Sequence, residues 1–305
     1  MVDLNRTDNL KIMFWNIRGI ASKNDELCKI LEAFDICICV ESWLRDVNGK
    51  IKLNFPGFNI FRKDREYTRG GGIIFLIRKN IAFKEINDLI SPHQHLEIAS
   101  IKITNTKTPL NLIACYKPPR ISLTQYEWDR LLENCTFYDN VVMVGDFNAH
   151  NVAWNCSSNK VDGSRLLNSI NKYNLFVHNI NTITHFDVNS GSTSNIDLII
   201  SPINVASQLE VKVQDDLHGS DHYPLSLTLN VEKSIYIKKT FRLRSLRTDW
   251  EKFLLRLDEG YTDFLNPAYD ELPTLVKYSK LVDTITNAVK QITPKKKNCV
   301  SQCAP

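Results

Sequence analysis

Residues 141–150 read VVMVGDFNAH, and this stretch decides how the rest of the chain is placed. The apolar run at 141–144 is short enough for a buried strand, and Gly145 ends it. Because residues two apart on an extended chain point the same way, Asp146 and Asn148 would project together from the end of that strand. A carboxylate can bind a metal ion or accept a proton, and a carboxamide can hold a phosphoryl oxygen. Taken alone, the stretch equally fits a strand followed by an Asp-Asn turn.

Other apolar runs also predict strands that end in polar residues. Residues 10–15 are followed by Asn16, and residues 36–40, which come after a predicted helix at 24–34, are followed by Glu41. A strand, a helix and a strand in succession predict parallel pairing with a right-handed crossover. Asn16 and Glu41 are then expected at the same edge of a sheet, although a lone Glu after a strand is more often a surface residue.

Four further polar residues lie in predicted strands or next to them. Tyr116 stands where prolines stop a strand. Asp197 lies among strand apolars, where a buried carboxylate requires a cation or a hydrogen-bond donor. Asp221 and His222 precede the last alternating strand, at 225–231. The number and order of these elements, with further helices at 124–135 and 163–174, predict an α/β sandwich in which two sheets pack face to face.

Length and charge favour one large domain with an appendage. The chain has 305 residues, 43% hydrophobic and 24% charged, which allows a sizeable core. We expect a sandwich at 1–232 and a mostly helical extension at 233–305. The extension holds fourteen Lys and Arg against eight Asp and Glu, a net charge of +6, whereas residues 1–232 have a net charge of −2. A basic extension suits an anionic partner such as nucleic acid, although a solvated helical face more commonly explains a charge run.

The cysteines and the chain start indicate an intracellular protein without a membrane partner. The eight cysteines lack the paired spacing of a zinc site and are expected to be reduced thiols. Cys299 and Cys303 form a single C-x3-C, which would need a second pair to make a four-ligand site. The first residues are polar, and no stretch approaches ~18 uninterrupted apolar residues.

A basic segment precedes a triple glycine at 70–72. Its members are Arg62, Lys63, Arg65 and Arg69. They could line a nucleic-acid groove or be plainly solvated, and the pattern does not separate these two interpretations. The glycines open a strand and lack the Lys-Ser or Lys-Thr of a phosphate loop, so they predict a tight turn.

Together, the polar residues at strand ends suit metal-assisted hydrolysis of a phosphate ester. Glu41 offers a hard oxygen ligand for Mg2+. His222 and Asp197 make a base and the carboxylate that orients it. Hydrogen bonds to non-bridging phosphate oxygens would come from Asn16, Tyr116 and Asn148. The sequence contains no Ser or Cys nucleophile motif, which favours direct attack of water on phosphorus.

These motifs resemble the endonuclease/exonuclease/phosphatase superfamily, and within it the endonuclease domain of non-LTR (LINE-type) retrotransposons. The resemblance covers about residues 10–231 through WNIRG (15–19), ESWL (41–44), RGGG (69–72), CYKPP (115–119), GDFNAH (145–150), SNIDLII (194–200) and SDHYPL (220–225). It implies a four-layer, DNase-like sandwich of two mixed β-sheets flanked by helices, with a helical basic C-terminal extension. It also implies an Mg2+-dependent endonuclease, with Mn2+ as an alternative ion. Such an enzyme nicks double-stranded DNA and leaves a 3′-hydroxyl for target-primed reverse transcription, which places its action in the nucleus.

The resemblance further implies roles for individual residues. Those on the metal side would be Asn16, Glu41 and Asp221. Those at the phosphate and the attacking water would be Tyr116, Asp146, Asn148 and Thr184, with Asp197 supporting His222. Those that bind DNA would be Arg62, Lys63, Arg65, Arg69 and Asn195, and the polar loop 187–195 would lie near the DNA groove.

One residue departs from the superfamily pattern, and other functions stay open. Arg18 stands where abasic-site repair enzymes carry an acidic residue, which puts a second metal ligand and abasic-site repair in doubt. The resemblance implies a reverse transcriptase domain in the full-length element, which this chain does not contain. A phosphatase or phosphodiesterase on a small or lipid substrate, and an inactive DNA-binding relic of a retroelement, are the competing interpretations.

Overall fold

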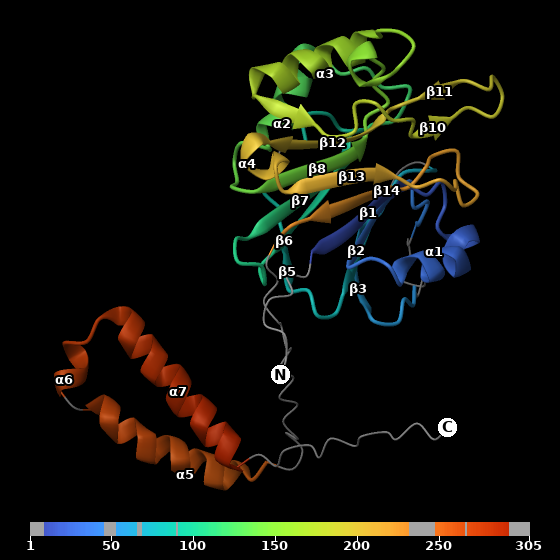
Figure 1. Ribbon diagram of the computed structural model, residues 1–305. Helices are drawn as coiled ribbons and strands as arrows, with labels where there is room; N and C mark the ends of the chain where they lie inside the picture. The colour runs from blue at the N-terminus through green and yellow to red at the C-terminus, as the bar shows by residue number, and fades with distance from the viewer. Residues whose placement is uncertain are drawn as a thin grey trace, which may run out of the picture. The chain divides into compact units, whose positions relative to one another are not determined.

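The computed structural model describes residues 9–45, 53–65, 69–89, 91–231, 248–265 and 267–292. The chain divides into two units, residues 1–237 and 238–305, which are described separately (Figure 1). The strands are β1 Leu10–Asn16, β2 Ile36–Val40, β3 Phe58–Lys63, β4 Ile73–Arg78, β5 Phe83–Glu85, β6 Glu97–Ile103, β7 Leu110–Tyr116, β8 Val141–Asp146, β9 Leu175–Val177, β10 His185–Phe186, β11 Thr193–Ser194, β12 Asp197–Pro202, β13 Leu209–Val213 and β14 Leu225–Leu229. The helices of the first unit are α1 Asn24–Leu31, α2 Gln125–Glu133, α3 Val161–Lys172 and α4 Ile203–Ala206.

Two mixed six-stranded sheets form the body of the first unit. The first sheet has the order β13-β14-β1-β2-β4-β3, and the second has the order β5-β6-β7-β8-β12-β9. As predicted from the strand, helix and strand at its start, β1 and β2 pair in parallel. β10 and β11 form a separate two-stranded hairpin that projects from the body (Figure 1). The predicted four-layer sandwich is therefore confirmed.

Alternation along the strands separates three apolar layers. Between the sheets lie residues such as Ile12 and Phe14 of β1 and Val142 and Val144 of β8. The intervening residues, such as Met143, pack instead under α2 and α3 on the outer face of the second sheet. A third cluster lies between the first sheet and α1. Side chains alternate between the two faces of a strand. A polar residue that lies two positions after an inward-pointing apolar residue therefore also points between the sheets.

The described part of the second unit contains three α-helices, α5 Trp250–Tyr261, α6 Pro267–Asp270 and α7 Thr274–Ile292, as the sequence predicted for a helical extension. Gly260 allows α5 and α7 to approach closely, since a Cβ there would lie 2.5 Å from Cγ2 of Thr284. Cys299 and Cys303 lie outside the described residues. Within the part of the chain that is described, no helix combines the length and apolarity needed to cross a membrane.

Most predicted elements are present, and apart from the two-residue strands β10 and β11 the missed strands lie at sheet edges. The sequence analysis assigned no strand to β3, β5 or β13. These strands lie at the edges of the two sheets, where one face is exposed and the apolar run is interrupted. All six cysteines within the described residues are free, five of them buried, which agrees with reduced core thiols.

Candidate active site

The site lies at one end of the sandwich. There, the side chains that point from both sheets into the space between them, called the inner rows, change from apolar to polar. In the second sheet, Glu97, Tyr116, Asp146 and Asp197 are direct partners across β6, β7, β8 and β12. Asn16 ends the inner row of β1 in the first sheet. The apolar residues behind them fix the register, so these polar groups are held in place by core packing.

Asn16 joins the two sheets. It is only 1% exposed. Its Nδ2 donates to Oδ2 of Asp146 at 2.9 Å and to Oε1 of Glu41 at 3.2 Å. Its Oδ1 accepts the backbone N–H of Arg18. Asn16 thus supplies the hydrogen-bond donor between two facing carboxylates, and its expected role as a metal ligand stays a prediction.

His222 and Asp197 form the predicted pair. Nδ1 of His222 lies 2.8 Å from Oδ2 of Asp197, and both side chains are buried. The backbone carbonyl of His222 accepts the indole N–H of Trp15 at 2.9 Å, which anchors the loop before β14. Nε2 of His222 lies 3.5 Å from Nδ2 of Asn16, so the free ring nitrogen faces the polar cluster.

Burial and charge shift the proton affinities of Asp146 and His222. Burial raises the pKa of Asp146 from 3.8 to about 8, and the charges of Asp197 and Glu41 add to this increase. Burial alone would lower the pKa of His222. The carboxylates of Asp197, Asp146 and Asp221 outweigh burial and raise the pKa of His222 to about 9. The cluster therefore favours a protonated imidazole next to a carboxyl group that titrates near neutral pH.

Glu41 and Tyr116 close the cluster on the side of β2 and β7. Glu41 adopts a left-handed backbone conformation, with φ of 53°, and its Oε2 accepts the indole N–H of Trp43 at 3.1 Å. Burial and the nearby charges of Glu41 and Asp146 raise the pKa of Tyr116 well above its ordinary value of 10. Tyr116 is therefore a hydrogen-bond donor throughout the physiological pH range.

Asn148 follows Asp146 in a tight turn. Its backbone N–H donates to Oδ1 of Asp146 at 3.1 Å, and its own φ is 45°. Its Nδ2 donates to the carbonyl of Lys117 at 2.9 Å. This turn brings the segments after β7 and β8 together at the mouth of the site.

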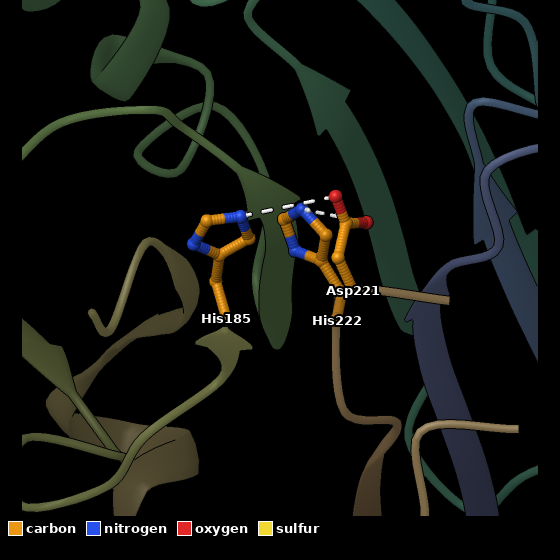
Figure 2. Close-up of side chains that lie close together, drawn as sticks. All are labelled: His185, Asp221 and His222. Carbon is orange, nitrogen blue, oxygen red and sulfur yellow. Dashed lines mark ion pairs between the residues drawn. The ribbon is translucent and has the colours of Figure 1, made fainter. Parts of the chain in front are cut away.

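Asp221 lies between two histidines and an arginine. Figure 2 shows His185 and His222 side by side with the Asp221 carboxylate facing both rings. Nε2 of His185 is 4.0 Å from Oδ2 of Asp221, and Nε2 of His222 is 3.9 Å from Oδ1. Arg18 forms an ion pair with Oδ2 of Asp221. The residue that departs from the superfamily pattern thus neutralises part of the acidic charge at the site.

The site contains groups that fit a divalent cation. Asp146, Asp197 and His222 have ligand atoms within 4.8 Å of one another, as do His185, Asp221 and His222. Oδ1 of Asp197 and Oδ1 of Asp221 are buried without a hydrogen-bond partner in the described protein. A buried carboxylate oxygen without a donor is costly, and a cation or a bound water would satisfy it.

Two predicted contact residues are placed differently from the expectation. Thr184 and Asn195 are both fully buried. Oγ1 of Thr184 accepts the backbone N–H groups of Ile196 and Asp197, each at 3.1 Å. The amide of Asn195 is bonded to that of Asn179, which in turn donates to the carbonyl of Asp197 at 2.7 Å. Both residues hold the start of β12, and the contacts of Thr184 with the phosphate and of Asn195 with DNA stay predictions.

The four basic residues of the segment before the triple glycine fall into two groups, one bonded to neighbouring protein groups and one lining a cavity. Arg62 forms an ion pair with Asp64 at 3.5 Å, and Nζ of Lys63 donates to the carbonyl of Ile98 at 3.1 Å. The other two, Arg65 and Arg69, line a cavity next to Glu41 and Tyr116. Arg65 also forms an ion pair with Glu97.

The sequence analysis missed His185 and Glu97. His185 lies in a two-residue strand, which is too short for a periodic signal, and burial lowers its pKa. Glu97 opens an alternating strand on the inner side, so its position relative to Ala99 and Ile101 was the available signal.

The fold and part of the sequence match known proteins. The family model for endonuclease-reverse transcriptase matches residues 110–226. A comparison with curated proteins gives no match. The solved endonuclease domain of TRAS1, a telomere-specific non-LTR retrotransposon, is 15% identical, with a TM-score of 0.61 over 73% of this chain and 100% of that chain.

Two further solved nucleases have a similar fold. The AP endonuclease LMAP from Leishmania major is 12% identical, with a TM-score of 0.59 over 72% of this chain and 87% of its own. A 3′-5′ exonuclease from Neisseria meningitidis is 16% identical, with a TM-score of 0.55 over 72% of this chain and 99% of its own. Residues 110–226 thus match the endonuclease-reverse transcriptase family model, and the first unit shares its fold with a non-LTR retrotransposon endonuclease domain, as the resemblance in the sequence led us to expect.

Proposed function

We propose that this chain is an Mg2+-dependent DNA endonuclease. It nicks double-stranded DNA by attack of water on phosphorus and leaves a 3′-hydroxyl that can prime reverse transcription on nuclear DNA. The observation that carries the proposal is the buried cluster in which one amide, that of Asn16, bridges Asp146 and Glu41 beside the Asp197–His222 pair. Such a cluster brings together carboxylates that attract a divalent cation and a protonated imidazole, and both can stabilise negative charge on a phosphodiester.

The raised pKa values divide the proton-transfer roles. Asp146 titrates near neutral pH, which suits a general base for the attacking water. His222 stays protonated to about pH 9 and can donate from Nε2 to a non-bridging phosphate oxygen whose charge grows in the transition state. This assignment differs from the expectation that His222 is the base. The hydroxyl of Tyr116, which remains protonated, would add a second donor.

Glu41 and the free Oδ1 of Asp221 offer hard oxygen ligands for Mg2+ or Mn2+. A bound divalent cation would supply electrophilic stabilisation of the phosphate and the leaving oxygen. Asn16 would keep the carboxylates of Glu41 and Asp146 at a fixed separation.

Nicking of supercoiled plasmid is the direct test. We expect nicking with Mg2+ and none in EDTA, and a loss on the order of 10²-fold or more for Asp146→Ala and for His222→Ala. Lys172→Ala, which changes a lysine paired with Asp129 between α3 and α2, is the control. A folded Asp146→Ala or His222→Ala variant that nicks at the wild-type rate would refute the assigned roles.

The same samples separate the competing functions. Extension of the nicks by a DNA polymerase without end treatment would identify a 3′-hydroxyl. Hydrolysis of a phosphomonoester or of phosphoinositide vesicles, without nicking, would indicate a phosphatase. Binding of DNA with neither activity would indicate an inactive relic. The rate should rise with pH as Asp146 ionises and fall as His222 loses its proton.

A further inference from the structure

A large cavity lies directly beside the buried cluster formed by Asn16, Glu41, Asp146, Asp197 and His222. Its volume is about 990 Å³, and it is lined by Glu41 and Tyr116 on the side of the cluster. The remaining lining includes Trp43, the arginines Arg45, Arg65, Arg69 and Arg120, and the turn at Gly70 and Gly71. This volume is at the upper end of the ~300 to 1,000 Å³ of small-molecule sites, so it exceeds what a phosphate group and its waters need.

Trp43 is held at the cavity in an unfavourable backbone conformation. Its φ is 55°, a value that large side chains rarely adopt, and its backbone N–H donates to the carbonyl of Gly71 at 2.9 Å. Its ring lies close against Gly19, where a Cβ would come within 2.8 Å of Cε3. The side chain is nevertheless 49% exposed. A strained, exposed tryptophan that the surrounding structure fixes in place is typical of a ligand-contacting residue.

The indole also connects the cavity to the reaction site. Its N–H donates to Oε2 of Glu41, so the ring plane is set by the carboxylate proposed to hold the metal ion. Across the cavity, the guanidinium of Arg65 lies over the ring of Tyr116, 5.6 Å from its centroid. The described lining thus presents an aromatic surface and four guanidinium groups, of which that of Arg65 is paired with Glu97, together with the single carboxylate of Glu41.

We propose that this cavity binds one unstacked nucleotide adjacent to the scissile phosphate, with its base stacked on Trp43 and its phosphates near the arginines. The inference rests on the proposed function, since it names the form of DNA that the site accepts. An aromatic face gives about 1 to 3 kcal/mol per stacked base without reading sequence. The base must first leave the duplex stack, which costs least where it is unpaired.

The expected consequence is a preference for DNA that carries an unpaired nucleotide. A gain of about 1 to 3 kcal/mol corresponds to roughly 5-fold to 150-fold tighter binding. The protein should therefore bind a duplex with one unpaired nucleotide more tightly than the same duplex fully paired. Its nicks in the first substrate should lie next to the unpaired nucleotide.

Binding in EDTA tests this proposal independently of catalysis. The probes are two duplexes that carry 2-aminopurine at the same place, one with that base unpaired and one with it paired. The wild type should bind the unpaired probe more tightly and quench its fluorescence. Trp43→Phe keeps a ring and should retain the preference, whereas Trp43→Leu should lose it. Both variants lack the N–H to Glu41, so their difference reports stacking alone.

Trp250→Leu is the matched control, because Trp250 is a tryptophan of similar exposure, 57%, in the second unit. It should leave the preference unchanged. Equal affinity of the wild type for the two probes, or an undiminished preference in folded Trp43→Leu, would overturn the proposal. A preference for the unpaired probe in a protein that fails to nick plasmid with Mg2+ would support the nucleotide site and refute the nuclease function.

Discussion

Replacing Asp146 by Asn should abolish nicking and make the protein more stable above neutral pH. The carboxyl is 1% exposed and lies beside two other carboxylates, and its pKa rises from 3.8 to about 8 on folding. One pKa unit corresponds to about 1.4 kcal/mol, so ionised Asp146 destabilises the fold by up to about 6 kcal/mol. The variant removes this cost.

The stability gained by Asp146→Asn is reduced because the Asn side chain cannot accept both hydrogen bonds that Asp146 accepts. Asp146 accepts from Nδ2 of Asn16 and from the backbone N–H of Asn148. An Asn side chain has one carbonyl oxygen, so its amino group would face one of these donors, at a cost of about 1 to 3 kcal/mol. We expect a net gain of about 3 to 5 kcal/mol at pH 9.

The sign of the pH dependence follows from the direction of the shift. Between about pH 4 and pH 8 the unfolded chain has lost the Asp146 proton while the folded chain keeps it, so the wild type loses stability as pH rises. The advantage of Asp146→Asn should therefore be close to zero near pH 5 and grow up to about pH 8. Asp187→Asn is the control of opposite sign, because backbone N–H groups lower the pKa of Asp187.

Urea unfolding in EDTA at pH 5, 7 and 9 measures these differences. A variant that is less stable than the wild type at pH 9, or whose advantage is the same at all three pH values, would refute the reasoning. That result would mean that Asp146 is solvated or paired more favourably than its surroundings indicate.

Three other changes test how the site is supported. Asp162→Ala should destabilise the fold by about 3 to 5 kcal/mol in urea unfolding, because Asp162 is the ion-pair partner, at 3.4 Å, of the buried amine of Lys117. Gly163→Ala should destabilise it by more than about 2 kcal/mol in the same assay, since a Cβ would lie 1.9 Å from the carbonyl oxygen of His150. Replacing residues 187–192 by a short Gly-Ser turn should keep plasmid nicking but redistribute the mapped nick positions, and an unchanged map would place site selection elsewhere.

The sequence was informative wherever a long strand preceded a polar residue. Asn16, Tyr116 and Asp146 were predicted at strand ends, and the structure places all three between the sheets. The reason is physical, because an apolar run with a period of two fixes both the strand and the face of its last residue. The same signal placed Glu41 next to Asn16, and the two side chains are 3.2 Å apart.

The sequence could not predict which polar side chains form hydrogen bonds and ion pairs with one another. Thr184 and Asn195 stand next to a polar segment that reads as a loop. Their side chains nevertheless accept hydrogen bonds from buried groups around Asp197, namely its backbone N–H and the amide of Asn179. Such partners depend on tertiary placement, and local pattern gives no sign of them. The ion pair between Arg18 and Asp221 joins residues 203 positions apart, so it too became visible only with the fold.

The proton affinities that the proposed chemistry needs arise from the same alternation that builds the core. Val142 and Val144 lie between the sheets. The side chain of Asp146, two residues further along β8, therefore points between the sheets as well. Had the strand ended one residue earlier or later, the carboxylate would face the helices α2 and α3, where Met143 and Phe147 pack. It would then be distant from Asn16 and His222. Burial between the sheets, next to Asp197, is what raises the pKa of Asp146 toward neutrality. The position of Asp146 between the sheets therefore determines both how much its ionised form destabilises the fold and the pKa on which the proposed base role rests.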